Sequence, residues 1–338
     1  MSFKSSLQKI IYANQSGKHE QFIEGIREII VAERKRGHNR IADDLEKTLA
    51  DANRPSLLHQ PLKQLSRPSH YVSSSRTVPL SKGDNLPLIE VMHPHVTFDD
   101  VVLNNKAQKR VDRIVHEQAE RSSLAKHGLR PISKVLFYGP PGCGKTLTAH
   151  VLASVLGWPL LYTRFDSVIS SYLGETSINL RRVFEFASDG PCILFFDEFD
   201  AIGKSRNEQS DVGELKRVVN AFLQMMDNYR GDSLIIAATN FEELLDRALW
   251  RRFDETICFN RPATRDIENL LRMRLGGVRL YDFSPSDIAS CFDNLTYSDI
   301  TRICIDAIKQ MVLTERASLT KQDILGALDH YLESRPSA

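Results

Sequence analysis

Short apolar runs recur through the middle of the chain, with little polar alternation inside them. Strands that are buried on both faces of a sheet have this composition, because helices cover both faces. Helical patterns lie between the runs. The sequence therefore predicts an α/β fold, a parallel sheet with helices on both faces, over residues 95–262. The predicted strands are residues 135–138, 160–164, 192–196, 234–238 and 256–259.

The strand pattern stops after Pro262, and apolar residues then recur at helical spacing as far as Tyr331. This pattern predicts a small all-helical subdomain over residues 263–338. One apolar stripe in it consists of Ile300, Ile303, Cys304, Ala307, Ile308 and Met311.

Residues 3–52 also carry helical patterns, which predict a small helical domain over residues 1–53. Within it, the basic stretch 33–40 has two interpretations: contact with nucleic acid or, more commonly, cations that end a helix before Gly37. Prolines and serines become frequent over residues 54–94. That composition predicts a linker with little secondary structure of its own, able to dock on a neighbour.

Composition narrows the class of protein. The 338 residues are 42% hydrophobic and 26% charged, which is typical of a globular chain of two or three domains. A formal net charge of +1 argues against an overall basic surface that binds nucleic acid. It does not exclude a local basic patch. The five cysteines form no C-x-x-C pair and suggest neither a disulfide framework nor a zinc site. No apolar run approaches the roughly 18 residues of a membrane span, so we expect a cytoplasmic protein without a membrane anchor.

A glycine-rich loop joins the first predicted strand to the helix that follows. Gly139, Gly144, Lys145 and Thr146 fill the pattern G-x-x-x-x-G-K-[ST] in strand–loop–helix context. A triphosphate needs backbone N–H groups turned toward its oxygens, which requires residues without an obstructing Cβ, and it is stabilised by the positive end of a helix dipole. Lys145 would bridge the β- and γ-phosphates, and the Thr146 hydroxyl would ligate Mg²⁺. The sequence thus predicts binding of ATP with Mg²⁺.

Polar residues follow two of the other predicted strands. Asp197 and Glu198 come directly after the run 192–196, and Asn240 follows the run 234–238. The carboxyl ends of parallel strands meet at the ligand crevice of an open sheet, so these side chains should lie beside the glycine loop. Asp197 would hold Mg²⁺ and Glu198 would polarise the attacking water. Asn240 could orient that water, or could be ordinary turn chemistry after a strand.

Arg251 and Arg252 stand side by side near the end of the predicted sheet region. They could form a solvated face. In a phosphate-transfer enzyme they could also stabilise the developing transition state, an effect of roughly 10³ to 10⁵ in rate for a complete arginine finger. The sequence leaves open whether they would act on their own nucleotide or on a neighbour's.

Taken together, residues 97 to about 328 resemble an AAA ATPase module, with the motifs in the order and spacing of that family. The resemblance implies that Asp197 and Glu198 belong to Walker B and that Asn240 is sensor 1. It also implies that Arg251 and Arg252 are arginine fingers that reach across a subunit boundary in a ring, usually a hexamer. The adjacent arginines are similar to those of the katanin and spastin branch. The nucleotide-binding residues implied for Walker A are Gly139, Pro140, Pro141, Gly142, Cys143, Gly144, Lys145, Thr146 and Leu147.

Further segments resemble the same family. Tyr172 and Leu173 resemble the tip of pore loop 1, which grips polypeptide in the central channel, and residues 204–213 occupy the position of pore loop 2. Residues 223–229 are similar to the intersubunit signalling segment, with Asn228 and Tyr229 in place of the usual Gly and Phe. Val102 lies in the segment 99–103, which resembles the one whose backbone contacts adenine.

Two departures from the family stand out. The predicted helix that opens with Tyr297-Ser298-Asp299 lacks the usual Gly-Ala, and no arginine stands at its start where sensor 2 would be. His116 and Glu117 look superficially like the start of an H-E-x-x-H zinc site, but the second histidine is missing and the segment precedes the phosphate loop. A metalloprotease site is therefore rejected.

Three functions follow as hypotheses. The first is a ring-forming, Mg²⁺-dependent ATPase that remodels or threads protein through its pore, with the N-terminal helices selecting the client. The second is an ATP-driven regulator of a separate effector, such as a subtilisin-like serine protease. The third, a nucleic-acid loader, predicts basic pore loops, whereas residues 171–175 are aromatic and acidic. A nucleotide-binding scaffold without turnover is the remaining alternative.

Overall fold

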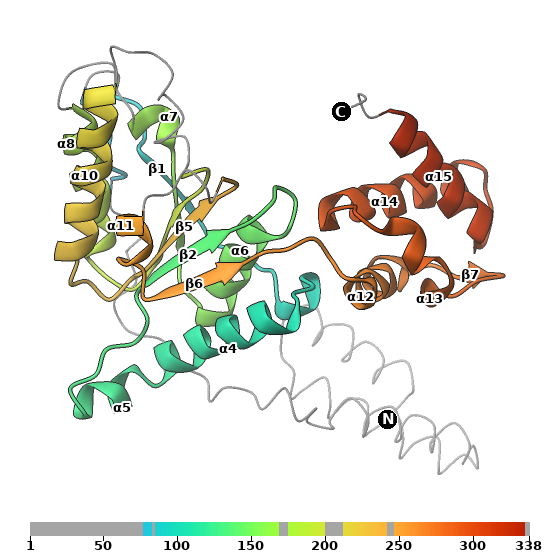
Figure 1. The fold of residues 1–338 in the computed structure, drawn as a ribbon, viewed down its shortest axis with the longest axis horizontal. Coiled ribbons are helices and arrows are strands. Elements are labelled where there is room, and N and C mark those ends of the chain that lie inside the picture. The colour runs from blue at the N-terminus through green and yellow to red at the C-terminus, as the bar shows by residue number, and fades with distance from the viewer. Residues whose placement is uncertain (1–76, 83–84, 169–174, 200–211, 242–246, 335–338) are drawn as a thin grey trace, which may run out of the picture. The chain divides into compact units, whose positions relative to one another are not determined.

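The computed structural model describes residues 77–82, 85–168, 175–199, 212–241 and 247–334 (Figure 1). The chain divides into two units, residues 1–65 and 66–338, and every described residue belongs to the second. The predicted N-terminal helical domain, residues 1–53, lies outside the described residues. The predicted boundaries at 53, 94 and 262 remain predictions.

A six-stranded sheet forms the centre of the larger part of this unit, in the order β1-β3-β4-β5-β2-β6. All neighbouring pairs are parallel except β1 and β3, which are antiparallel. The prediction of a parallel α/β sheet is confirmed. The strands are β1 (Ile89–Met92), β2 (Lys134–Tyr138), β3 (Leu160–Thr163), β4 (Ile193–Phe196), β5 (Leu234–Thr239) and β6 (Glu255–Cys258).

Alternate residues of each inner strand enter two different apolar cores. In β4, Ile193 and Phe195 join one core while Leu194 and Phe196 join the other, and all four are fully buried. Side chains alternate across a strand, so a strand covered on both faces must be apolar throughout. This is the reason that the central strands could be recognised from the sequence.

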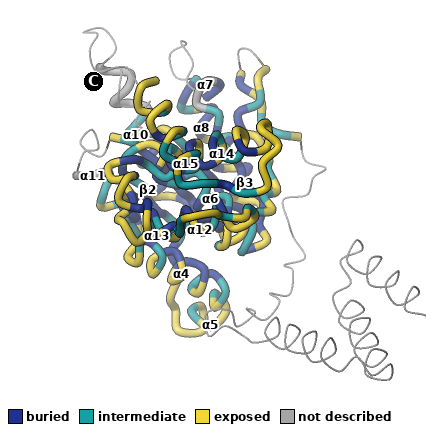
Figure 2. Tube along the Cα trace, turned by 90° about the vertical axis from the view of Figure 1, so that its right-hand side faces the viewer, coloured by how far each residue is buried: buried dark blue, intermediate teal, exposed yellow. Residues whose placement is uncertain are grey.

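Helices cover the two faces of the sheet. On one face lie α4 (Asn105–Ala119) and α6 (Lys145–Leu156), and on the other α8 (Glu175–Ala187) and α10 (Val212–Asn228) (Figure 1). Buried stretches gather in the sheet and on the inner sides of these helices, whereas α5 (Arg121–Lys126) carries no buried residue (Figure 2). Two further short helices are α7 (Phe165–Val168) and α11 (Arg247–Trp250).

Strand β1 lies inside the segment 54–94 for which the sequence predicted little secondary structure, so that prediction was wrong for residues 89–92. The strand pairs with β3 in the register Ile89↔Thr163 to Met92↔Leu160. Leu88 and Ile89 are buried, while Glu90 and Val91 are exposed. A four-residue edge strand with one buried residue, next to several prolines, gives a weak signal.

The C-terminal part is mainly helical and has its own apolar core, which includes the stripe Ile300, Ile303, Cys304, Ala307 and Met311. We call it the lid. A parallel pair of two-residue strands, β7 (Leu280–Tyr281) and β8 (Leu319–Thr320), was not predicted. The helices of the lid are α12 (Thr264–Leu275), α13 (Pro285–Ile288), α14 (Tyr297–Leu313) and α15 (Lys321–Glu333).

No helix in the described part of the chain is long and apolar enough to cross a membrane.

Candidate functional site

The loop between β2 and α6 holds three glycines with positive φ: Gly139 at 129°, Gly142 at 72° and Gly144 at 95°. A Cβ on Gly139 would lie 2.2 Å from the Phe259 carbonyl oxygen, and one on Gly142 would lie 2.2 Å from Ser298 Oγ. Gly139 therefore requires glycine for space as well as for backbone conformation, whereas a Cβ on Gly142 would require the Ser298 and Thr296 side chains to shift. The loop ends at Lys145, where α6 begins with its N-terminus toward the loop.

Lys145 is buried, with 6% of its surface exposed. Its Nζ donates hydrogen bonds to two carbonyl oxygens of the same loop, those of Gly139 at 2.7 Å and Pro140 at 2.8 Å. A buried ammonium group needs such acceptors, since burying it unpaired is costly. The lysine is therefore held within the loop, where it can exchange these carbonyls for the oxygens of an anion.

The acidic pair follows β4 directly. Thr146 Oγ1 donates to Asp197 Oδ2 at 2.8 Å, so the start of α6 and the end of β4 meet through these side chains. A hydroxyl and a carboxylate are hard oxygen ligands of the kind that Mg²⁺ prefers. These two residues thus fit a magnesium ion.

Glu198 has a φ of 48°, in the left-handed region that costs a non-glycine residue about 1–3 kcal/mol. The turn is fixed on both sides, because Glu198 N–H donates to Asp197 Oδ1 at 3.0 Å and Phe199 N–H donates to the Ala238 carbonyl at 2.8 Å. Glu198 itself is exposed. Backbone strain of this kind clusters at functional sites.

A cavity of about 750 Å³ brings the predicted residues together. Lys145, Thr146, Asp197, Glu198 and Asn240 all line it. Of the other residues predicted to bind nucleotide, the lining includes Val102, Pro141, Gly142, Gly144 and Leu147, but not Gly139, Pro140 or Cys143. Cys143 instead packs into the core with 2% of its surface exposed, and burial raises the pKa of its thiol.

The lid forms the other wall of the cavity, and most of its contribution was missed by sequence reasoning. One face of α14 provides Ser298, Thr301, Arg302, Ile305 and Lys309. Their spacing of three and four residues marks one side of a helix and could have indicated a shared surface. From α12 come Leu270, Met273 and Arg274, and Tyr297 opens α14.

The start of α14 contacts the glycine loop directly. Ser298 N–H donates to the Gly142 carbonyl at 3.1 Å. Ser298 lies in the segment Tyr297-Ser298-Asp299, where this sequence lacks the Gly-Ala that is usual in AAA ATPases. Tyr297 packs against the cores of both parts, and burial, aided by the nearby charge of Asp266, raises the pKa of its phenol.

Arg251 and Arg252 do not line this cavity. Arg251 is exposed, and Arg252 Nε forms an ion pair with Asp227 Oδ2 at 2.9 Å. Asp227 stands near the end of α10, in the segment that resembles the intersubunit signalling motif. The two arginines therefore point to a role outside their own cavity or to an ordinary surface role.

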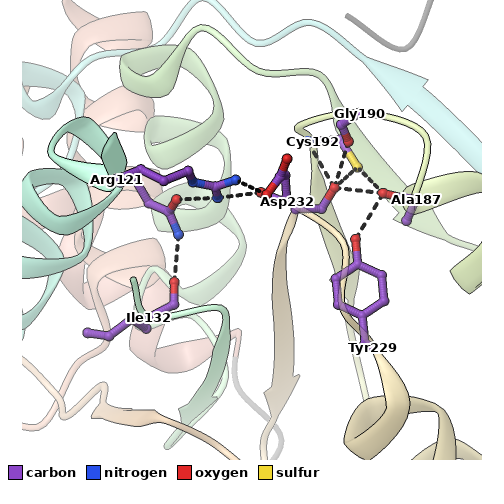
Figure 3. Close-up of polar contacts among 9 residues, drawn as sticks. Arg121, Ile132, Ala187, Gly190, Cys192, Tyr229 and Asp232 are labelled. Carbon is purple, nitrogen blue, oxygen red and sulfur yellow. Dashed lines mark hydrogen bonds and ion pairs between the residues drawn. The ribbon is translucent and has the colours of Figure 1, made fainter. Parts of the chain in front are cut away.

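The chain just after α10 is anchored to the end of α8 by a buried polar network (Figure 3). The Tyr229 hydroxyl donates to the Ala187 carbonyl at 3.0 Å, and Ser233 Oγ donates to the same oxygen at 2.7 Å. Burial raises the pKa of Tyr229. Tyr229 thus fixes the chain two residues after Asp227.

The predicted pore residues Tyr172 and Leu173 lie outside the described residues, and so do residues 204–211 of the predicted second pore loop.

A parallel sheet with a glycine loop between β2 and α6, and an acidic pair at the end of a neighbouring strand, defines a P-loop nucleoside triphosphatase. The family model described as "ATPase family associated with various cellular activities (AAA)" matches residues 135–261.

Among curated relatives, the chain is 36% identical over 312 residues to an uncharacterized AAA family ATPase, y4kL, of Sinorhizobium fredii, covering 92% of this chain and 91% of that protein. It is 31% identical to the proteasome-activating nucleotidase of Pyrococcus abyssi over 75% of this chain and 67% of that one. It is 33% identical to the peroxisomal ATPase PEX6 of Colletotrichum orbiculare, of which it spans only 17%. The chain belongs to the AAA ATPase family, and its reaction is the hydrolysis of ATP. The likeness to the katanin and spastin branch remains a prediction.

Proposed function

We propose that this chain is the subunit of a ring, usually a hexamer, that uses Mg²⁺-dependent ATP hydrolysis to remodel protein by threading it through a central pore. The observation that carries the proposal is that only some of the residues predicted to act on ATP line the cavity. Lys145, Asp197, Glu198 and Asn240 line one cavity, while Arg251 and Arg252 do not. A site that lacks its arginines within one chain is completed when a neighbour supplies them.

Within one subunit, the glycine loop and the N-terminus of α6 bind the phosphates through backbone N–H groups. Lys145 leaves the Gly139 and Pro140 carbonyls for phosphate oxygens. Thr146 and Asp197 would hold Mg²⁺, which would neutralise charge on the phosphates. Glu198 polarises the attacking water, and Asn240 orients it.

The neighbouring subunit supplies Arg251 and Arg252 to the transition state. Asp227 holds Arg252 at 2.9 Å, so a movement of the end of α10 would be transmitted to the arginines. Tyr172 and Leu173 would grip the polypeptide, and the region 1–53 would select the client. A cytoplasmic setting fits this role.

A second candidate is an ATP-driven regulator of a separate protease, such as a subtilisin-like serine protease. The likeness to a relative named proteasome-activating nucleotidase favours it. Threading requires the pore residues Tyr172 and Leu173 for binding of the polypeptide, whereas regulation of a separate protease does not.

A trapping experiment tests the proposal. Glu198→Gln protein with ATP and Mg²⁺ is mixed with fluorescently labelled casein, an unfolded protein, and separated by size. The proposal predicts that casein elutes with a ring-sized species in ATP but not in ADP, and that adding Tyr172→Ala abolishes its retention while the ring persists. Equal retention with and without Tyr172 would contradict threading.

A further inference from the structure

Phe241 exposes an aromatic ring beside the nucleotide cavity. It follows Asn240, which lines the cavity, and β5 ends two residues earlier at Thr239. The backbone is fixed there, because Phe241 N–H donates to Thr239 Oγ1 at 3.1 Å. Even so, 45% of Phe241 is exposed to solvent. A single exposed apolar side chain is ordinary, and it acquires meaning only when a complementary surface exists.

Such a surface lies between α8 and α10 (Figure 1). A hollow of about 460 Å³ there is lined by both helices and by the chain that follows α10, and we call it the α8–α10 socket. The buried rings of Phe184 and Tyr229, whose centroids lie 6.1 Å apart, supply apolar surface, and the half-buried Met225 adds a thioether. Aromatic rings pack well against both kinds of surface. The socket therefore suits an aromatic side chain.

The socket adjoins the arginines that the proposed function assigns to a neighbour's ATP site. Tyr229, in the socket, comes two residues after Asp227, whose Oδ2 accepts from Arg252 Nε at 2.9 Å. The Tyr229 hydroxyl donates to the Ala187 carbonyl at 3.0 Å and so fixes this stretch to α8 (Figure 3). The socket and Arg252 therefore belong to one region of the subunit.

A shared ATP site brings Phe241 and the socket together. If Arg251 and Arg252 of one copy reach the cavity of the next, they approach Asn240, since Asn240 lines that cavity. Phe241 adjoins Asn240 on the receiving copy, and the socket adjoins Arg252 on the donating copy. Docking of the arginines therefore carries the socket toward Phe241.

Charge favours the same pairing. At the socket, Arg181 and Arg230 are exposed cations, and Glu185 is the one acidic residue among the described residues that line it. On the receiving copy, Asp197 and Glu198 line the cavity, and Glu198 is exposed. Opposite charges on two faces steer and orient their association.

We infer that Phe241 of one copy inserts into the α8–α10 socket of a second copy, and so anchors the interface across which the ATP site is shared. The inference rests on the proposed function, because it requires a ring in which Arg251 and Arg252 face a neighbour. The interface is head-to-tail, since each copy offers Phe241 at one place and the socket at another, and such interfaces build rings. An aromatic anchor in a desolvated pocket typically contributes a large share of the binding energy.

The test measures ring assembly. Glu198→Gln protein with ATP and Mg²⁺ is diluted, and sedimentation velocity gives the protein concentration at which half of the subunits are assembled. Adding Phe241→Ala should raise that concentration about tenfold or more, because a buried aromatic anchor is lost. Met225→Ala should raise it less, and the double variant should assemble no more weakly than Phe241→Ala alone, because the contact is lost only once. Tyr281→Ala, which truncates a 64% exposed aromatic on β7, is the matched control and should change nothing.

A second readout separates docking from an effect on the adjacent Asn240. For Phe241→Ala with Glu198 intact, ATP turnover per subunit should fall at low protein concentration and recover at high concentration, where mass action restores the ring. ATP affinity measured in dilute, unassembled protein should stay unchanged. Turnover that stays low at every concentration would assign Phe241 to the orientation of Asn240 and would overturn the inference.

Cross-linking locates the contact. Phe241→Cys subunits are mixed with Met225→Cys subunits, both with the partly exposed Cys258 and the exposed Cys291 replaced by serine, and are oxidised with diamide in the presence of ATP and Mg²⁺. Covalent dimers should form in the mixture and in neither variant alone, because only the mixture places a thiol on each side of one interface. Mixed rings that assemble but give no covalent dimer would overturn the inference.

Failure of the proposed function has a different signature. Should the wild-type chain form no ring with ATP, or should mixed rings of Arg251→Ala and Glu198→Gln subunits show no hydrolysis, the shared site itself would fail. Should that hydrolysis appear while Phe241→Ala assembles as readily as its parent, the shared site would stand and the inference about the socket alone would be wrong.

Discussion

Lys145 is the residue on which nucleotide binding most depends. Its buried ammonium group rests on the carbonyls of Gly139 and Pro140 and is the nearest cation to the glycine loop among the residues that form the site. We predict that Lys145→Ala loses at least a hundredfold in ATP affinity, about 3 kcal/mol, because a charge-assisted contact to the phosphates disappears. Titration with a fluorescent ATP analogue measures this, and retained affinity would refute the assignment of the phosphate loop.

Gly142 combines two constraints that can be separated. Its φ of 72° disfavours any side chain, and a Cβ would also lie 2.2 Å from Ser298 Oγ. Gly128 has nearly the same φ, 71°, but nothing lies within 4 Å of a Cβ there. We predict that Gly128→Ala costs about 1–2 kcal/mol of unfolding free energy from backbone strain alone, with ATP affinity unchanged.

Gly142→Ala should cost more than Gly128→Ala and should also weaken ATP binding, because the added methyl group separates the loop from α14. Urea unfolding and nucleotide titration of both variants measure the two effects. If both variants lost the same free energy of unfolding and kept their ATP affinity, the extra methyl group at Gly142 would not disturb the contact between the glycine loop and α14.

Among the elements, the inner strands were the easiest to predict, and β1 was missed. Strands such as β4 and β5 are buried throughout, so their composition alone identifies them. Strand β1 has one buried residue among four, and its place is determined by pairing with β3, a contact that local sequence does not encode.

The lid side of the cavity was hidden for a related reason. The apolar stripe of α14 shows which side of the helix faces the core. On the other side, the sequence pattern does not distinguish a polar residue that faces water from one that lines a cavity. Arg274 and Arg302 were therefore missed, while the glycine loop and the acidic pair were found from their fixed spacing. The catalytic roles of the predicted residues remain predictions.

The N-terminus of α14 offers a further test. Thr296 caps α14 and accepts a hydrogen bond from Asp299 N–H at 3.3 Å, and Thr320 caps α15 in the same way with Asp323 at 3.2 Å. Each Thr→Ala change should cost about 1 kcal/mol of stability. Only α14 touches the glycine loop, through Ser298, so only Thr296→Ala should raise KM for ATP. Steady-state kinetics measures KM for ATP in the two variants, and thermal unfolding checks that their stabilities match. An equal rise in KM in both variants would contradict the coupling of α14 to the loop.

For the whole molecule, the separation of Arg251 and Arg252 from the cavity has the largest consequence. The exposed Arg251 is available to a neighbour, and Arg252 is held by Asp227 at 2.9 Å. If the proposed shared site is correct, such a chain should bind nucleotide alone but hydrolyse it efficiently only when another subunit is present. ATP turnover per subunit should accordingly rise with protein concentration until the ring is fully formed.

Mixing two inactive variants measures this sharing most directly. Arg251→Ala subunits keep Glu198, and Glu198→Gln subunits keep Arg251, so each variant alone should hydrolyse ATP very slowly. Combined in equal amounts, they should recover hydrolysis at about a quarter of the interfaces under random assembly, where an intact site meets an intact arginine. If mixed rings form but show no recovery at any ratio, the arginines do not complete a neighbour's site and the account of a shared ATPase centre is wrong.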